Sequence, residues 1–307
     1  PARSDRTIQE HGTEEHMGRQ RTRHWQVGDV KITRIYEMMD QFEPSFAYPD
    51  ADRELVRQHP WLVPDFATPD GQLFLWFQAF VVASRGRRIM VDTCIGNGKE
   101  REIPVCSNLQ TSFLEDLTAA GYPPESIDTV LCTHLHFDHV GWNTRLMDGR
   151  WVPTFPNARY LFGRKEWEYT QAQVAAGPSG HVVQVADSIQ PVIDAGLAEF
   201  VESDHRVNDE VWLEPTPGHT PGHVSIHISS RGQDAVITGD IFHNPFQFAE
   251  PDLRTAFCFD NEVARQTRKD FLERYEDRKA LIVGSHFCDP TAGWATRERR
   301  NWRFSGA

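Results

Sequence analysis

Apolar and polar positions along the first half of the chain form patterns that predict strands and one helix. Residues 27–36 alternate as in a half-buried strand that follows a turn. Two nearly continuous apolar runs, 73–83 and 88–92, predict a pair of strands joined by the turn-forming residues 84–87. Phe and Leu at helical spacing over 111–120, followed by glycine and prolines, predict a helix that covers one face of the sheet.

The second half continues with short strands and helices. Apolar runs predict strands at 129–132, 158–162, 198–201, 211–213, 224–228, 234–238 and 280–283. Periodic stretches predict helices at 165–176, 188–195 and 262–277. We interpret the last residues, 291–307, as a helical or irregular tail.

Polarity divides the chain into an arm and one domain. Residues 1–24 are polar, mixed in charge and almost free of large apolar side chains, which predicts a flexible N-terminal arm. We expect residues 25–307 to form a single domain. Within it, residues 42–70 are rich in aromatic side chains and proline and are long for a connection, which is typical of a functional insertion. This insertion is expected to form either a pocket wall or a homodimer contact, with a short helix in 50–58.

Composition and charge argue against nucleic-acid and membrane partners. With 307 residues, of which 39% are hydrophobic and 25% charged, the chain is long enough for a sizeable core. The formal charge of −12 and the lack of a basic run argue against a nucleic-acid partner. Five scattered cysteines without a C-x-x-C pair fit reduced thiols and a cytoplasmic location. We expect no membrane partner, because no stretch reaches the roughly 18 apolar residues of a span.

Residues 134–139 contain the highest density of potential metal ligands in the sequence. Three imidazoles and one carboxylate follow the predicted strand 129–132 directly, so they lie where a strand ends and a loop begins. Imidazole and carboxylate are the ligands that suit zinc and similar metals. Together with further ligands downstream, four such groups are too many for one tetrahedral ion, so the spacing indicates two metals.

The motif His134-x-His136-x-Asp138-His139 resembles the H-x-H-x-D-H signature of the metallo-β-lactamase-fold hydrolases. Three further stretches resemble motifs of that family, and they follow in the family's order. They are its second metal loop at 216–223, its bridging-aspartate strand end at 238–240 and its last ligand at 284–286. The resemblance implies an α/β (α+β) fold, the four-layer αβ/βα sandwich of two mixed sheets with helices outside.

The same resemblance implies a ligand set. The family's ligand positions correspond to His134, His136 and His219 for the first metal, to Asp138, His139 and His286 for the second, and to Asp240 as the bridge. We expect two divalent ions, zinc first, although this ligand type also suits manganese, iron and cobalt. Asp92, at the end of the predicted strand 88–92, would orient ligands or cap its strand. His223 would be a supporting residue of the second metal loop.

Resemblance also indicates catalytic residues. Two adjacent ions would ionise a shared water to hydroxide near neutral pH, and Asp138 would orient it. His243 follows Asp240 by three residues, where family members that open acyl-homoserine lactones often carry a tyrosine. A histidine there can donate a hydrogen bond or a proton, which makes Asp138 and His243 the expected catalytic residues. The alternative for His243 is a loop residue at the pocket rim. Residues 239–243 are similar to the methyl parathion hydrolase-like branch.

These features predict a zinc-dependent hydrolase of the esterase, lactonase or phosphotriesterase type. It would use a metal-bridging hydroxide to cleave a small ester-like substrate, namely a lactone, a carboxylic ester or a phosphotriester. The alternatives are a hydrolytic dehalogenase, a glyoxalase II-like thioesterase and a non-catalytic ligand-binding relative. Thioesterase specificity would need a cationic patch for an anionic peptide, and we find none in the sequence. The complete ligand set argues against a binder.

Overall fold

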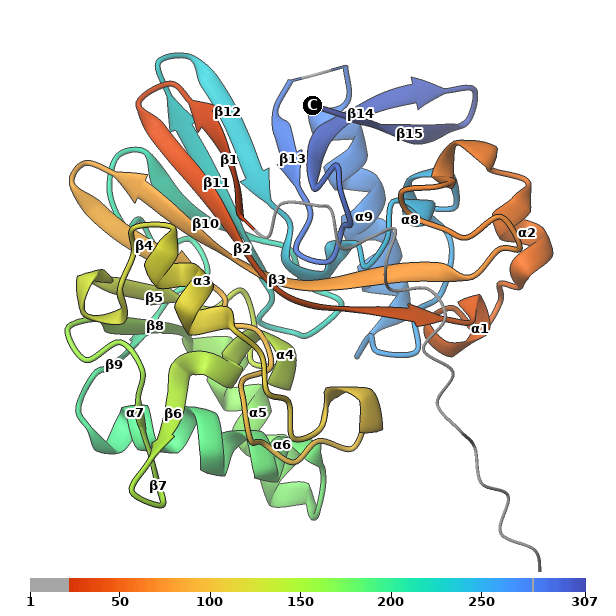
Figure 1. Ribbon diagram of the computed structural model, residues 1–307. Helices are drawn as coiled ribbons and strands as arrows, with labels where there is room; N and C mark the ends of the chain where they lie inside the picture. Colours follow the sequence, from red (N-terminus) through yellow and green to blue (C-terminus); the bar gives the residue numbers. More distant parts are fainter. Residues whose placement is uncertain (1–21, 278) are drawn as a thin grey trace, which may run out of the picture.

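Two mixed β-sheets lie face to face in the computed structural model, which describes residues 22–277 and 279–307 (Figure 1). The first sheet contains, in spatial order, β1 (Thr22–Val27), β2 (Val30–Phe42), β3 (Leu73–Ser84), β4 (Arg87–Val91), β5 (Thr129–Leu131), β8 (Arg159–Gly163) and β9 (Ala198–Val201). The second contains β10 (Val211–Pro215), β11 (Val224–Ser230), β12 (Gln233–Ile237), β13 (Leu281–Val283), β14 (Ala292–Glu298) and β15 (Asn301–Gly306). A separate hairpin is formed by β6 (Thr144–Met147) and β7 (Arg150–Pro153).

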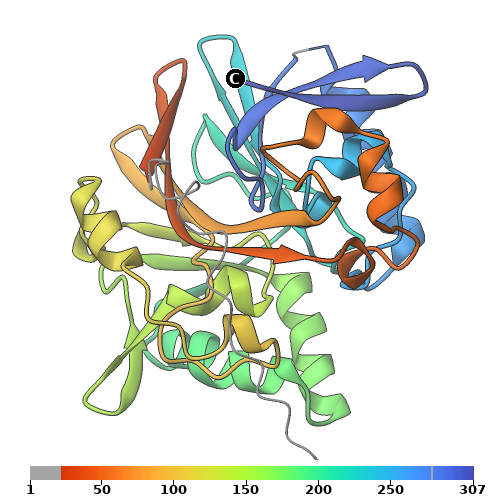
Figure 2. The same ribbon diagram turned by 45° about the vertical axis from the view of Figure 1, so that its right-hand side comes forward.

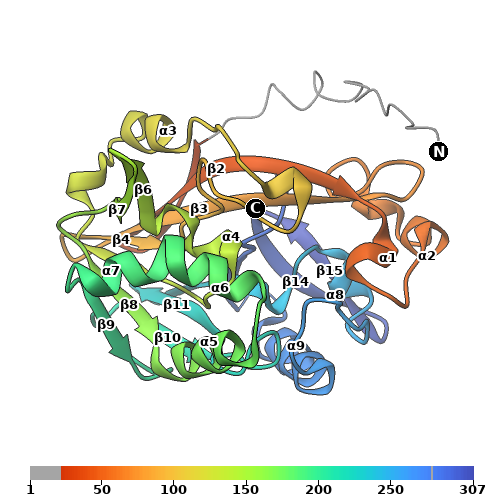
Figure 3. The same cartoon turned by 90° about the horizontal axis from the view of Figure 1, so that it is seen from below.

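Helices accompany both sheets on their outer sides (Figure 3). On the side of the first sheet they are α3 (Phe113–Ala119), α4 (Phe137–Val140), α5 (Arg164–Ala176), α6 (Gly180–Gln184) and α7 (Gln190–Asp194), with a π-helical turn η5 (Val185–Ile189). On the other side are α8 (Phe246–Ala249) and α9 (Asn261–Tyr275). Asp260 caps α9 by accepting the backbone N–H groups of Glu262 and Val263, which satisfies two donors that lack partners within the helix.

The alternating side chains of β3 explain how the layers hold together. Phe80 is buried in one cluster with Ile226 and Ile237 of the second sheet. Its neighbour Val81 points the other way and is buried with Leu117 of α3. Because successive side chains of a strand face opposite sides, an almost wholly apolar strand fits a sheet covered on both faces. The predicted αβ/βα sandwich is confirmed.

The insertion at 42–70 packs against the C-terminal part of the chain (Figure 2). It forms α1 (Pro44–Ala47), α2 (Arg53–Arg57) and η1 (Pro60–Leu62). The ring of Phe66 lies edge-on to that of Phe304, 5.8 Å between centroids, and the hydroxyl of Tyr48 donates to Gln247, 3.2 Å away. α2 lies within the short helix expected at 50–58. A homodimer contact through this segment stays a prediction.

The two chain ends differ from the sequence-based interpretation. Residues 1–21 of the expected arm lie outside the described residues, but Thr22–Val27 form β1, which pairs with β2. The interpretation of 291–307 as a helical or irregular tail is wrong, because these residues form the hairpin β14–β15. Trp302 and Phe304 are 4% and 3% exposed there. Among the described residues, no helix is long and apolar enough to cross a bilayer.

Candidate metal centre

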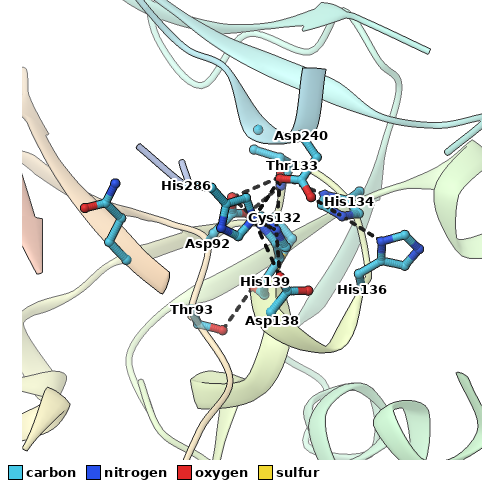
Figure 4. Close-up of polar contacts among 12 residues, drawn as sticks. Asp92, Thr93, Cys132, Thr133, His134, His136, Asp138, His139, Asp240 and His286 are labelled. Atoms are coloured by element: carbon cyan, nitrogen blue, oxygen red, sulfur yellow. Dashed lines mark hydrogen bonds and ion pairs between the residues drawn. The ribbon is translucent and has the colours of Figure 1, made fainter. Parts of the chain in front are cut away.

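The predicted ligands lie in loops after β5, β12 and β13, except His219, which lies in the loop between β10 and β11. β4 and β5 are parallel, and Val91 pairs with Leu131. β12 and β13 are also parallel, and Ile237 pairs with Val283. Because paired parallel strands end at the same edge, the loops after these strands converge. Figure 4 shows the resulting cluster of imidazoles and carboxylates.

Three imidazoles form the first cluster. Nε2 of His134 lies 3.1 Å from Nδ1 of His136, and Nε2 of His219 lies 3.2 Å and 2.9 Å from these two atoms. Two nitrogen ligands of a tetrahedral zinc ion lie about 3.3 Å apart, given Zn–N bonds of about 2.0–2.1 Å. The three nitrogens therefore have nearly the spacing of one face of a metal's coordination shell.

Asp240 joins this cluster to a second one. Its Oδ2 lies 3.3 Å from Nε2 of His219, whereas its Oδ1 lies 3.1 Å from Nε2 of both His139 and His286. The latter two nitrogens are 3.2 Å apart. Oδ2 of Asp138 lies 3.6 Å from Nε2 of His286 and 3.7 Å from that of His139. The structure thus brings all seven expected ligands together in two groups, with Asp240 between them, and Asp240 also forms a group with His219 and His243.

The outer hydrogen bonds of the second cluster fit a bound cation. Nδ1 of His286 donates to the carbonyl oxygen of Trp76 at 2.8 Å, and Nδ1 of His139 lies 2.9 Å from Oδ2 of Asp92. A neutral imidazole that donates outward from Nδ1 carries a lone pair on Nε2. In the neutral form that binds a metal, both Nε2 atoms and Oδ1 of Asp240 are acceptors that face one another. A divalent ion satisfies all three at once.

The charges around the two clusters differ. Burial lowers the pKa of His134 and His219 well below the usual value and lowers that of His136 to about 4, so all three are neutral at pH 7. Burial also opposes the charged form of His139, but nearby carboxylates, Asp240 first, outweigh it and raise this pKa well above its usual value. The first cluster therefore offers neutral imidazoles, whereas the carboxylates of the second favour a proton on His139, which a bound metal cation would replace.

Asp92 orients two of the expected ligands. It contacts His139 directly, and its Oδ2 accepts the hydroxyl of Thr133 at 2.9 Å. The oxygen of Thr133 in turn lies 3.1 Å from Nδ1 of His134 and accepts its N–H. Asp92 also accepts the backbone N–H of Thr133 at 2.7 Å, so it both orients ligands and joins the ends of two strands.

His223 supports the bridging aspartate from behind. Its Nε2 accepts the backbone N–H of Asp240 at 2.8 Å, and its Nδ1 lies 3.0 Å from the carbonyl oxygen of Thr216. Both ring nitrogens are therefore engaged in hydrogen bonds. Gly239 has a positive φ of 56°, and a Cβ there would lie 2.5 Å from Nε2 of His223. Only glycine fits this turn.

A cavity of about 590 Å³ opens over both clusters. Its apolar wall comes mainly from the insertion, from β3 and from the segment before α9, and it includes Phe42, Phe46, Ala47, Leu75, Phe77, Ile103, Phe137 and Phe257. His243 also lines the cavity and is 4% exposed. Its Nε2 lies 3.3 Å from Oδ2 of Asp240, and neither of its ring nitrogens has a hydrogen-bond partner among the described residues. The ring is therefore free to contact a ligand.

Two further side chains fix the first cluster, and the sequence did not indicate them. Oε1 of Glu166 accepts the backbone N–H of Leu135 at 3.2 Å, and its Oε2 accepts Thr220 Oγ1 at 2.7 Å and the N–H of Gly222 at 3.1 Å. Gln184 donates to the carbonyl oxygen of Leu135. Leu135 separates two of the imidazoles, so its peptide groups are held from both sides. Glu166 lies in a charged helical stretch, which gave no local signal of this role.

Comparisons with known proteins agree with this geometry. An N-acyl homoserine lactonase from a Bacillus species is 28% identical over 184 residues, which cover 58% of this chain and 62% of that protein. A probable metallo-hydrolase from Mycobacterium tuberculosis is 24% identical over 208 residues, which cover 59% and 63%. The match thus spans less than two thirds of the length of these curated relatives.

Solved structures extend the similarity over almost the whole chain. The hydrolase AbOPH, in the beta-lactamase superfamily, is similar with a TM-score of 0.77 and 25% identity, over 93% of this chain and 97% of that one. AidC, a dizinc quorum-quenching lactonase solved with a product, has the same fold, with a TM-score of 0.75 and 19% identity over 93% and 97%. The family model of the metallo-beta-lactamase superfamily matches residues 78–286, more than half of the chain. The chain belongs to the metallo-beta-lactamase superfamily.

Proposed function

We propose that this chain is a dinuclear-metal hydrolase that cleaves an ester-like bond in a small uncharged molecule: a lactone, a carboxylic ester or a phosphotriester. The observation that carries this proposal is the pair of His/Asp clusters that share Asp240 on the floor of a largely apolar cavity. Zinc is the ion that this donor set favours. When bound, two such ions supply a water-derived nucleophile near neutral pH and polarise the oxygen of the scissile bond.

Three residues around the clusters would position the metals and the reacting groups. Asp240 offers one oxygen to each cluster and so fixes their separation. Asp138 lines the cavity and is placed to accept a hydrogen bond from the attacking oxygen, which orients it. His243 has an unpartnered ring beside Asp240 and is placed to donate a hydrogen bond or proton to the leaving oxygen.

The cavity wall supports an uncharged, partly apolar substrate. Its aromatic and aliphatic lining side chains offer apolar surface, and they include Phe42, Phe46, Leu75, Phe77 and Phe257. No lysine or arginine occurs among the described lining residues. This composition disfavours the glyoxalase II-like alternative, because a glutathione thioester is anionic. The lactonase and hydrolase names of the relatives support the proposed class.

The proposal is tested with purified, zinc-loaded protein and a panel of one lactone, one aryl ester and one phosphotriester. We expect metal-dependent turnover of at least one of them. His136→Ala removes one ligand of the first cluster, so turnover should be abolished and metal content lowered while the circular-dichroism spectrum is kept. His24→Ala, at an exposed position in β1, is the matched control. An active, metal-replete His136→Ala protein, or two bound metals without turnover of any substrate, would contradict the proposal.

A further inference from the structure

The sulfur of Cys258 contacts one of the expected metal ligands from outside the metal centre. Sγ lies 3.7 Å from Nδ1 of His219, and no other hydrogen bond to that nitrogen occurs among the described residues. Nε2 of the same ring faces the first cluster, 3.2 Å from Nε2 of His134 and 2.9 Å from Nδ1 of His136. The thiol and the cluster therefore lie on different sides of the ring, and each has one of its two nitrogens.

This contact determines which nitrogen of His219 carries the proton. A neutral imidazole has one N–H and one lone pair, so an Nδ1–H that donates to the sulfur leaves the lone pair on Nε2, where a metal needs it. Other expected ligands are oriented in the same way by oxygen atoms, namely those of Thr133, Asp92 and the carbonyl group of Trp76. A thiol sulfur is a weaker acceptor than these oxygens. The orientation of His219 therefore depends on a single weak partner.

The backbone next to Cys258 is attached to the second metal loop, which fixes the position of the sulfur. The N–H of Phe259 donates to the carbonyl oxygen of His219 at 2.8 Å, and the N–H of Asp260 donates to that of Gly218 at 3.0 Å. Gly218 has a positive φ of 131°, and a Cβ there would lie 2.3 Å from a backbone nitrogen of α9. The loop is thus packed directly against the segment that carries the thiol.

We propose that Cys258 is a positioning residue of the metal centre, whose thiol accepts the Nδ1–H of His219 and holds Nε2 of that ring toward the first metal. The inference rests on the proposed function, because it concerns the same metal centre. Cys258 belongs neither to the groups that could hold an ion nor to the lining of the cavity. Without this acceptor, a buried N–H has no partner and the ring is less firmly oriented, which weakens binding of the first metal.

Cobalt(II) binding to the metal-free protein tests this role without turnover. Absorption spectra and competition with a chelating dye give the affinity for each of the two ions. Cys258→Val fills the space without an acceptor, whereas the hydroxyl of Cys258→Ser can accept the same N–H. Ala256→Ser, at an exposed position in the same segment, is the matched control.

In Cys258→Val we expect one cobalt ion to bind about 10- to 100-fold more weakly and the other to bind as before. Cys258→Ser should keep most of the affinity, and Ala256→Ser all of it. Equal affinities in all four proteins, or a serine variant as weak as the valine variant, would overturn the positioning role. So would a sulfur-to-cobalt charge-transfer band that disappears in Cys258→Val, because the sulfur would then itself be a ligand.

If Cys258→Val does not fold, Cys258→Ala makes the same comparison with the serine variant. The outcomes are differences in affinity between variants, whereas the proposed function fails when the protein with two bound metals turns over none of the substrates. The two failures are therefore distinguishable.

Discussion

Asp240 is the residue on which both clusters depend, because its two carboxylate oxygens face different groups of imidazoles. Burial alone would favour its neutral acid, but the surrounding imidazoles, His139 first, outweigh this and hold its pKa well below the usual value. Its backbone is fixed by His223 and by the turn at Gly239. The bridging position is thus set by the protein itself.

A substitution of His243 should lower the rate of the reaction without loss of metal binding. In His243→Phe we expect kcat to fall about 100-fold or more, the usual contribution of a general acid or base, while two metals per chain are retained. His243→Gln, which keeps a donor, should lose less. Metal content by mass spectrometry and steady-state kinetics on the same preparations check this. Unchanged kcat in His243→Phe would show that the histidine is only a rim residue.

The expected ligands could be predicted residue by residue, whereas the cavity residues could not. His134 and His136 are two positions apart at a strand end, so their convergence follows from local geometry. Gln184 gave no comparable signal, because its role depends on the carbonyl oxygen of Leu135, which lies 49 positions away in the sequence. A lone polar residue shows its neighbours only when the chain is folded.

At the scale of elements, α5 anchors both metal loops through Glu166. This side chain is 2% exposed and accepts hydrogen bonds from residues in the two loops. Gly222 has no room for a side chain, since a Cβ there would lie 2.3 Å from the backbone nitrogen of Glu166. The close packing of this helix against the second loop therefore sets the distance between ligands that are far apart in sequence.

Glu166→Gln tests this anchoring. The amide offers an N–H where the carboxylate accepts from Leu135 or from Thr220 and Gly222, so one loop should lose its support. We expect metal affinity to fall about 10- to 100-fold, the usual effect of losing an outer partner of a metal ligand. Competition with a chelating dye measures it. Glu168→Gln, exposed on the same helix, is the control; equal affinities in all three proteins would refute the anchoring role.

Elements close to the metal motifs were easier to predict than those at the C-terminus. β5 and β13 are short apolar runs, and the ligands that follow them mark their ends. The hairpin β14–β15 was missed because its turn carries the charged residues 297–300, and its apolar side chains are isolated in the sequence. Phe304 becomes a core residue through ring contacts with Phe66, Phe248 and Phe287, which are all distant in sequence.

At the scale of the whole molecule, Glu37 links the long strand β2 to the loops around the centre. It is buried and accepts the N–H groups of Ile95 at 2.7 Å, Gly96 at 3.2 Å and the indole of Trp142 at 2.6 Å. Burial is the largest influence on it and raises its pKa from 4.5 to about 7 despite these hydrogen bonds. The folded protein therefore keeps a proton on Glu37 that the unfolded chain has already lost.

This difference predicts how stability depends on pH. Between 4.5 and about 7 the folded state binds more protons at Glu37 than the unfolded state, so rising pH lowers the free energy of unfolding there. One such group contributes a slope of at most about 1.4 kcal/mol per pH unit. Glu37→Gln should remove this contribution, and the exposed Glu115→Gln should not. Urea unfolding at several pH values measures it; equal slopes for Glu37→Gln and the unmodified protein would show that Glu37 is ionised throughout.

The overall architecture followed from family resemblance rather than from periodicity. Alternating patterns predicted most strands, but two packed mixed sheets and other arrangements fit the same order of elements. The match of the superfamily model over residues 78–286 and the neighbouring solved structures agree with the observed sandwich. Within that sandwich, the insertion at 42–70 contributes Phe42, Phe46 and Ala47 to the cavity wall.

The most direct test of the central claim is an anomalous-diffraction map of crystals grown with zinc. Two peaks about 3.5–4 Å apart are expected, one among His134, His136 and His219, the other among Asp138, His139 and His286, with Asp240 between them. A single peak, or no peak at these residues in zinc-saturated crystals, would contradict the account.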